Sequence, residues 1–190
     1  MIRCPWCLGD EIYVKYHDEE WGNPVTDDRK LFEALILDGA QAGLSWITIL
    51  KRRQSYREAF DGMDPEKMAR YGESDIARLM ADPGIIRNKR KILSAIGNAR
   101  SYLAMTEGPG SFSRWFWDWV DGEPVINRYK TMEEIPASTQ LSERISKELK
   151  KQGFSFVGPT IIYAFMQAAG LVNDHLADCF RHPATAGHGT

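Results

Sequence analysis

The cysteines and histidines of this chain gather near its two ends, and this distribution constrains the fold more than any other feature. Cys4, Cys7 and His17 lie at the start, whereas His175 and Cys179 lie close to the other end. Thiolate sulfurs and imidazole nitrogens are ligands that Zn²⁺ prefers in proteins, and four of them complete a closed structural site. A shared ion would therefore hold the two end segments together.

Spacing alone leaves the ligand set of such a site open. His175 and Cys179 are four residues apart, so in a helical segment both side chains would lie on one face. Cys4 and Cys7 have the two-residue gap of many structural zinc sites, and Cys4 with His17 is the alternative pair. Buried thiols beside an incidental histidine are the interpretation without a metal.

The middle of the chain predicts successive helices, because apolar residues recur at spacings of three and four between recognisable stops. In the helix expected at 27–38, Leu31, Phe32 and Leu35 share one face, and Gly39 follows its end. Strand signals are nearly absent, so the expected fold class is all-α. The other expected helices span residues 45–60, 64–71, 74–81, 86–105, 138–151 and 159–169.

Two apolar patterns predict core positions. The longest expected helix, 86–105, has a buried stripe formed by Ile92, Ala95, Ile96 and Ala99. The stretch 112–119 holds three of the six tryptophans, and an aromatic cluster of this kind invites a binding-site interpretation. We favour a place in the core for it.

Length and composition predict one globular domain. The chain has 190 residues, of which 43% are hydrophobic and 26% charged, and this suits a single well-cored domain. We expect that domain at 1–183 and a flexible tail at 184–190. No apolar run approaches the roughly 18 to 20 residues needed to cross a bilayer. The odd number of cysteines and the lack of a leader pattern predict a reducing, cytoplasmic setting.

The net charge argues against a protein that binds nucleic acid through a global positive field. The formal charge is −2 and the sequence pI is about 6.1. Any contact with DNA must therefore be local. Basic clusters at 51–53, 87–91 and 147–151 are candidates, although each could equally be a solvated helix face.

Three motifs carry a resemblance to a known family. They are YHDEEWG at 16–22, QAGLSW at 41–46 and GFSFVG at 153–158, and GIIR at 84–87 and LVNDH at 171–175 extend the match. With these motifs in this order, the chain resembles the 3-methyladenine DNA glycosylase I family, and the resemblance extends from Cys4 through Cys179. The resemblance implies an all-helical fold of the helix-hairpin-helix DNA glycosylase superfamily, with a zinc clamp that joins the two end segments.

The resemblance also implies the site residues. It assigns the structural zinc to Cys4, His17, His175 and Cys179, which replaces the spacing preference for Cys7 and leaves that thiol as a spare near the metal. Whether Cys7 can substitute for His17 stays open. The implied pocket has Asp38 and Tyr16 as its catalytic residues, and its base-binding residues are Trp6, Tyr13, Trp21 and Trp46.

The activity implied by the resemblance is base excision repair. A base inside a duplex is out of reach, so the enzyme rotates the nucleotide out and hydrolyses its glycosidic bond, which leaves an abasic site and free 3-methyladenine. Because this base is cationic in DNA, aromatic faces would attract it. The family has a glutamate where this chain has Asp38, so the carboxylate is kept but lies one methylene closer to the backbone.

Alkylated double-stranded DNA is the implied partner, and two further segments would contact it. Leu44, with Gly43, is the candidate wedge that fills the space of the flipped base. Backbone amides of the hairpin at 153–158 would bind phosphates, and Asp174 is expected to have a structural role beside His175. The implied phosphate contacts are Gly153, Phe156, Gly158, Lys150 and Lys151.

Three alternatives remain at this point. One is a glycosylase of the same superfamily with a different damaged base, and a second is a non-enzymatic zinc-containing helical module that binds DNA. A structural zinc protein without a role at nucleic acids is the third. In each case a monomer is expected.

Overall fold

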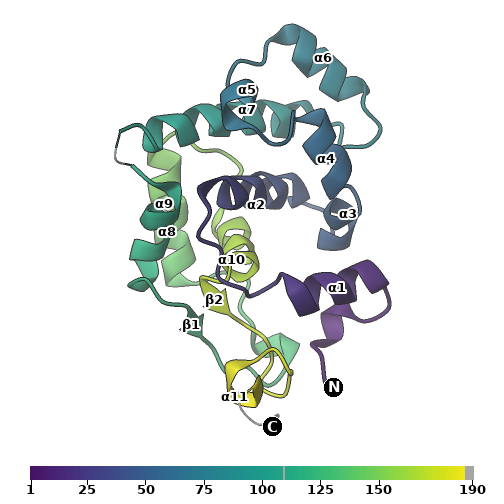
Figure 1. Cartoon of the computed structure of the whole chain (residues 1–190), viewed down its shortest axis with the longest axis vertical. Coiled ribbons are helices and arrows are strands. Elements are labelled where there is room, and N and C mark those ends of the chain that lie inside the picture. Colours follow the sequence, from purple (N-terminus) through teal and green to yellow (C-terminus); the bar gives the residue numbers. More distant parts are fainter. Residues whose placement is uncertain (109, 187–190) are drawn as a thin grey trace.

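Helices dominate the computed structural model, which describes residues 1–108 and 110–186 (Figure 1). The α-helices are α1 (Glu11–Glu19), α2 (Asp28–Gln41), α3 (Trp46–Leu50), α4 (Arg53–Ala59), α5 (Pro65–Met68), α6 (Glu73–Ala81), α7 (Lys89–Met105), α8 (Phe112–Trp117), α9 (Gln140–Lys151), α10 (Pro159–Ala168) and α11 (Pro183–Ala186). Short 3₁₀ turns lie at Pro5–Cys7, Asp118–Val120 and Met132–Glu134.

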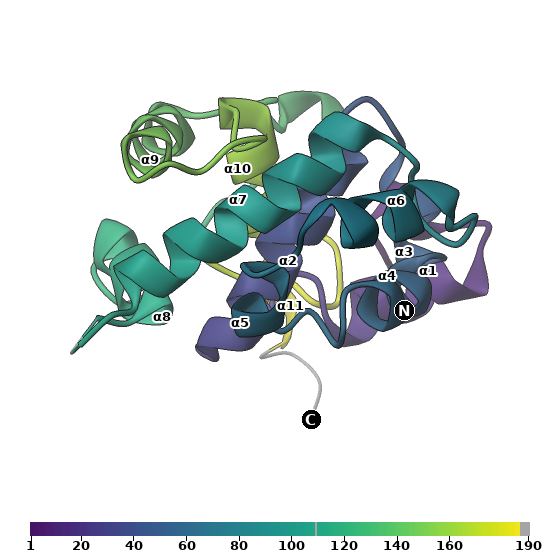
Figure 2. The ribbon, with the colours of Figure 1, turned by 90° about the horizontal axis from the view of Figure 1, so that it is seen from above.

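Helix α2 lies at the centre of the molecule. Its start is fixed by Asp27, whose carboxylate accepts a hydrogen bond from the Lys30 amide, a cap worth about 1 kcal/mol. As predicted, Leu31, Phe32 and Leu35 are fully buried. Helices α3, α7, α8 and α10 pack against α2, and α7 crosses over it (Figure 2).

The bounds predicted for the helices at 27–38 and 45–60 were wrong. Helix α2 continues past Asp38 to Gln41, and Gly39 lies inside it rather than after its end. A glycine suits this position because a side chain would come within 3.4 Å of the Phe156 carbonyl oxygen. The single helix expected at 45–60 is two helices, since the Arg52 amide bonds the Ile49 carbonyl, three residues back, at 2.9 Å.

The predicted core stripe of α7 is confirmed. All four of its residues are buried, although the helix begins at Lys89 rather than at 86, because the side chain of Asn88 caps it. In the aromatic stretch, Phe112, Phe116 and Trp117 are buried, so its place in the core is confirmed as well.

One small sheet departs from the all-α expectation. Strands β1 (Val125–Ile126) and β2 (Val172–Asn173) pair in parallel, with Val125 opposite Val172. Strand β2 leads directly into the segment that holds His175 and Cys179. The sheet therefore fixes where this late segment enters the site.

Part of the expected tail is helical. Of the tail expected at 184–190, residues 184–186 belong to α11 and residues 187–190 lie outside the described part of the chain. Within 1–108 and 110–186, no helix combines the length and the apolarity that crossing a membrane requires.

Candidate active site and metal cluster

Two neighbouring residues of α1 face different surroundings. Asp10 caps this helix by accepting a hydrogen bond from the Ile12 amide, and consecutive side chains then point about 100° apart. Tyr16 lines an aromatic pocket, whereas His17 belongs to a cluster of cysteines and histidines. Both side chains are buried. Helix α1 is thus the wall between the two sites.

The cluster brings together Cys4, His17, His175 and Cys179, and all four are buried. Their ligand atoms lie within 4.8 Å of one another. Cys179 Sγ is 3.4 Å from His17 Nε2 and 3.5 Å from His175 Nδ1, and Cys4 Sγ is 3.7 Å from the same Nδ1. Ligands of a tetrahedral zinc ion are separated by about 3.3 to 3.8 Å. The cluster can therefore hold a metal ion.

The other nitrogen of each imidazole is held by a fixed partner. His17 Nδ1 lies 2.8 Å from Asp18 Oδ1, and His175 Nε2 lies 3.1 Å from the Trp21 carbonyl oxygen. Arg3 pairs with Asp18 at 2.8 Å and lowers the pKa of its carboxyl. Such partners fix the orientation of metal-binding imidazoles.

Cys7 is not a member of this cluster. Its thiol is buried and donates a hydrogen bond to the Cys4 carbonyl oxygen at 3.2 Å. The Cys4–Cys7 pair that spacing favoured is therefore not the pair that meets His175. Cys7 instead steadies the turn that presents Cys4.

The segment that holds His175 and Cys179 does not have the helical conformation that the sequence analysis considered. Residues 174–179 form turns rather than a helix, and the Cys179 amide bonds the Leu176 carbonyl at 2.8 Å. Both side chains still reach the cluster because β2 holds the preceding backbone. Gly22 leaves room for the His175 ring, because a side chain at this position would lie 3.0 Å from His175 Nε2. The φ of Gly22 is +76°, a backbone conformation that glycine adopts readily.

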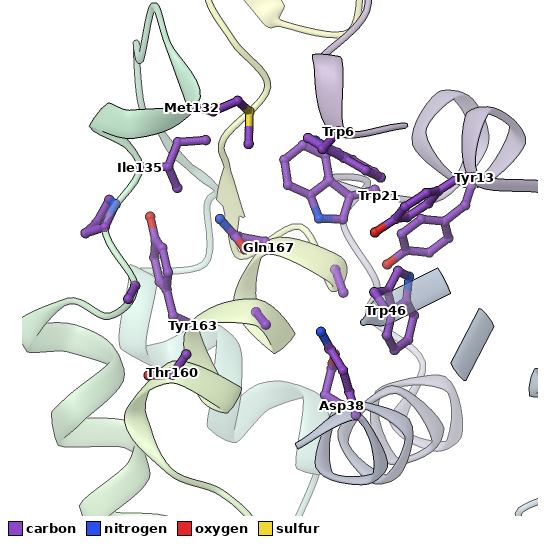
Figure 3. A pocket seen from close by; sticks show the side chains of 16 residues that line it. Trp6, Tyr13, Trp21, Asp38, Trp46, Met132, Ile135, Thr160, Tyr163 and Gln167 are labelled. Carbon is purple, nitrogen blue, oxygen red and sulfur yellow. The ribbon is translucent and has the colours of Figure 1, made fainter. Parts of the chain in front are cut away.

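The pocket beside Tyr16 has a volume of about 350 Å³, within the range of about 300 to 1,000 Å³ that is usual for small-molecule sites. Figure 3 shows side chains from the first part of the chain on one side, α10 and the 132–137 segment on the other, and Asp38 at the base. All six pocket residues implied by the resemblance line it: Trp6, Tyr13, Tyr16, Trp21, Asp38 and Trp46.

Two buried polar atoms of this pocket have no hydrogen-bond partner among residues 1–108 and 110–186. Asp38 is 3% exposed, and its Oδ2 is without a partner, as is Nε1 of Trp46. Burial raises the pKa of the Asp38 carboxyl well above its ordinary value. It also raises the pKa of Tyr16, with the nearby Asp38 charge as a smaller cause. An orphaned acceptor and an orphaned donor in one pocket indicate a polar ligand.

The aromatic side chains of the pocket pack on one another and on the cluster. The Trp6 ring lies 4.9 Å from Tyr13 and 5.0 Å from Trp21, both in edge-to-face contact. Trp21 in turn lies 4.6 Å from the His175 ring. The pocket wall is therefore fixed by contacts that continue to the cysteine–histidine cluster.

Sequence reasoning missed the side of the pocket that lies opposite the aromatic residues Trp6, Tyr13 and Trp21. The 132–137 segment contributes Met132 and Ile135, and α10 contributes Thr160, Tyr163 and Gln167. The α10 residues recur at spacings of three and four in an otherwise apolar helix, a signal that could have identified this face.

Asp174 supports the α10 face of the pocket from behind. Its carboxylate is 1% exposed and accepts hydrogen bonds from Tyr163 at 2.6 Å, Gln167 at 2.7 Å and Asn127 at 2.7 Å. It does not line the pocket. These contacts favour the structural role expected for it.

The candidate DNA contacts lie outside the pocket. Gly43, with a φ of +77°, and Leu44, which is 40% exposed, form the loop after α2. Residues 153–158 connect α9 to α10, and Gly153 and Phe156 both have positive φ. Lys150 and Lys151 are exposed at the end of α9, where Lys151 pairs with Glu148. These positions agree with the proposed contacts, whose roles stay predictions.

Comparison with known proteins gives one consistent family. The family model described as "Methyladenine glycosylase" matches residues 6–182. DNA-3-methyladenine glycosylase 1 of Escherichia coli (strain K12) is 51% identical over 183 residues, which is 96% of this chain and 98% of that protein.

Solved structures agree with this result. A crystal structure of 3-methyladenine DNA glycosylase I has a TM-score of 0.94 and 52% identity, and the match covers 96% of this chain and 100% of that one. A tyrosine-to-phenylalanine variant of such an enzyme, in complex with 3-methyladenine, has a TM-score of 0.92 and 38% identity over 96% and 98% of the two chains.

Proposed function

The chain belongs to the methyladenine glycosylase family, and on that premise we propose that it hydrolytically releases 3-methyladenine from alkylated double-stranded DNA. The bond between the base and C1′ of the sugar breaks, so that free 3-methyladenine and an abasic site are formed. The observation that carries the proposal is the buried, unpartnered Asp38 carboxyl at the base of an aromatic pocket.

The pocket suits a cationic base. Methylation at N3 gives adenine in DNA a positive charge, whereas unmodified adenine is neutral. The faces of Trp6, Tyr16 and Trp46 attract such a ring, each by about 0.5 to 2 kcal/mol. The Asp38 carboxylate adds a charge-assisted hydrogen bond, and neutral adenine gains less from both.

The charge on the base also explains why little further chemistry is needed. When the glycosidic bond breaks, its electron pair neutralises the methylated purine, which makes the base a good leaving group. Water adds to C1′ and gives up a proton to solvent. Tyr16 and Asp38 bind and orient the base during this step. No lysine lines the described pocket, so water rather than an amine is the nucleophile.

Gly43 and Leu44 act as the wedge in this proposal. An apolar side chain on an exposed loop can enter the space that an extruded base leaves in the stack. Leu44 meets this requirement, because its apolar side chain is 40% exposed on the loop after α2. The positive φ of Gly43 allows the turn that presents it.

The α9–α10 pair serves as a helix-hairpin-helix element that binds phosphate. The two helices pack together. Gly158 precedes α10 at the N-cap position and supplies no side-chain cap, so early amides of α10 can face an anion. Gly153, Phe156 and the exposed Lys150 and Lys151 complete the contact. These interactions position the duplex without reading its sequence.

Zinc is the metal that fits the cluster best. Two thiols and two imidazoles are a common structural zinc set, and the orientation of both imidazoles is already fixed. When bound, the ion would supply a structural cross-link, since four protein ligands leave no position for water. Cys4 and His17 would thereby be tied to His175 and Cys179.

The same proposal covers the setting and assembly of the protein. We propose a monomer as the active form, since the pocket and the cluster are each formed by residues that one chain supplies. We assign the glycosylase domain to residues 1–183. A DNA substrate implies work in the cytoplasm of a bacterial cell, such as those of its relatives.

Base release from randomly methylated duplex DNA tests the function. The wild type is expected to release chiefly 3-methyladenine, identified by chromatography, and Asp38→Asn is expected to slow release by about 100-fold. Asp121→Asn is the matched control, because this exposed residue has a positive φ that asparagine tolerates. Release of another base in its place would indicate a different specificity, and no release would leave only a binding module.

A further inference from the structure

Three polar residues lie along one buried face of α7. Lys91, Ser94 and Asn98 are spaced by three and four residues, so they share a face of the helix. Ser94 is 7% exposed and Asn98 is 3% exposed. Burying such groups is unfavourable unless they form hydrogen bonds, so their partners show what the face is for.

Lys91 binds the end of α2. Its Nζ donates to the carbonyl oxygens of Ala40 at 2.8 Å and Ala42 at 2.7 Å. Helix C-termini have unsatisfied carbonyls and a partial negative charge, so a lysine is a favourable cap there. Ala42 directly precedes Gly43 and Leu44. Lys91 therefore fixes the point from which the wedge loop leaves the helix.

Asn98 and Ser94 bind the middle of the hairpin. The side-chain oxygen Oδ1 of Asn98 accepts a hydrogen bond from the backbone N–H of Ser155 at 2.8 Å. The side-chain nitrogen Nδ2 of Asn98 donates one to the backbone carbonyl oxygen of Ser155 at 3.0 Å. Ser94 Oγ donates to the same carbonyl at 3.1 Å. Two side chains of α7 thus hold one hairpin residue by its backbone.

Helix α2, from which the wedge loop leaves, also lies close to the hairpin beneath α7. Gly39 of α2 approaches the Phe156 carbonyl, and only about 10 Å³ of space remains between α2, α7 and Phe156. That volume is no more than one water molecule needs. Figure 2 shows α7 as one straight helix above α2, between the α9–α10 pair and α3. The contact is tight and leaves little freedom.

We propose that Lys91, Ser94 and Asn98 are positioning residues for DNA binding. They hold the wedge loop and the phosphate-binding hairpin at a fixed separation, so that Leu44 enters the duplex at the point set by the phosphate contacts. This inference rests on the proposed function of the two loops. A displacement of about 1 Å in such a geometry can cost on the order of 100-fold in rate.

The Lys91→Met variant tests the inference, because it removes both hydrogen bonds and keeps an unbranched side chain that is only one atom shorter. We expect kcat/KM on alkylated duplex DNA to fall by about tenfold or more. The affinity for free 3-methyladenine, read from quenching of tryptophan fluorescence, should stay within about twofold of wild type, since it needs no wedge. Lys67→Met, at an exposed lysine of α5, is the matched control.

Each result of this experiment has a defined meaning. Unchanged activity on duplex DNA, or an equal loss of free-base affinity, would overturn the positioning role while wild-type activity still supports the proposed function. A wild type that releases no base would overturn the function itself.

A double-mutant cycle with Leu44→Ala shows whether Lys91 acts through the wedge. We expect the double variant to be about as impaired as Leu44→Ala alone. Losses that multiply would show that Lys91 does not act through Leu44 and would contradict the inference. Asn98→Ala gives the corresponding test at the hairpin, where free-base binding again reports whether the protein is folded.

Discussion

The cysteine–histidine cluster and the aromatic pocket share helix α1, yet they differ in how their buried polar groups are hydrogen-bonded. In the cluster, His17 and His175 each have a partner for the nitrogen that faces away from the ligand centre. In the pocket, Asp38 Oδ2 and Trp46 Nε1 are buried without partners. The first arrangement suits stability, and the second keeps hydrogen-bonding groups ready for a substrate.

The cluster therefore supports the pocket beside it. The backbone oxygen of Trp21 lies within hydrogen-bonding distance of His175 Nε2, and the Trp21 ring lies 5.0 Å from the Trp6 ring in the pocket. Buried polar groups without partners would gain hydrogen bonds if the pocket collapsed or rearranged. The rigid cluster next to the pocket opposes such a change. Proteins commonly accept such a local cost at functional sites and offset it elsewhere.

The largest expected effect comes from breaking the cluster. Cys179→Ser should lower the free energy of unfolding by about 4 kcal/mol, the scale seen when a structural metal is lost. Urea denaturation and the metal content of each chain would measure it. Cys7→Ser is the matched control, because a hydroxyl can still donate to the Cys4 carbonyl. Equal losses in the two variants would contradict the distinction between ligand and spare thiol.

The next effect concerns the pH dependence of the pocket. Burial raises the pKa of Asp38, and only the deprotonated form attracts a cationic base. Activity should therefore fall as pH falls through this raised pKa, by about tenfold for each further pH unit. The kcat/KM of base release, measured against pH, would show this limb with its midpoint above the ordinary aspartate range. Its persistence in Asp38→Asn would assign the titration to another group.

A smaller and opposite effect is expected on stability. Because the pKa of Asp38 is higher in the folded than in the unfolded chain, its contribution to stability is largest below the unfolded pKa. That contribution declines as pH rises toward the folded pKa. Asp38→Asn should therefore raise the free energy of unfolding at neutral pH by about 1 kcal/mol. Denaturation at pH 4 and pH 7 would check it, and the gain should shrink at the lower pH.

The smallest effect compares two tryptophans. Nε1 of Trp117 donates to the Val25 carbonyl at 2.8 Å, whereas Nε1 of Trp46 has no partner. Trp117→Phe should cost about 1 kcal/mol more in stability than Trp46→Phe, because only the first loses a hydrogen bond. Thermal denaturation of both variants gives the comparison. Equal costs would mean that the Trp46 donor is satisfied in solution.

Periodicity and motifs predicted much of this molecule. The buried face of α2, the core stripe of α7 and the helices around them follow from spacing alone. The metal ligands and six pocket residues follow from the resemblance, and the structure brings both sets together. Local patterns suffice where one helix face meets the core.

Features that depend on distant parts of the chain were not predictable in this way. Lys91 belongs to a basic cluster that the sequence presents as a surface, yet it points inward to the end of α2. Spacing cannot tell which of several cations faces a helix terminus. The 132–137 segment reaches the pocket through the path of the chain between β1 and α9, and no periodic pattern marks it.

The pairing of Cys4 and His17 with His175 and Cys179 also sets an order of events during synthesis. The ribosome makes Trp6, Tyr13 and Tyr16 well before it makes His175 and Cys179, which complete the cluster beside them. Until then the aromatic wall has no fixed place. A growing chain therefore completes the wall of its pocket only after residues 175–179 have been made.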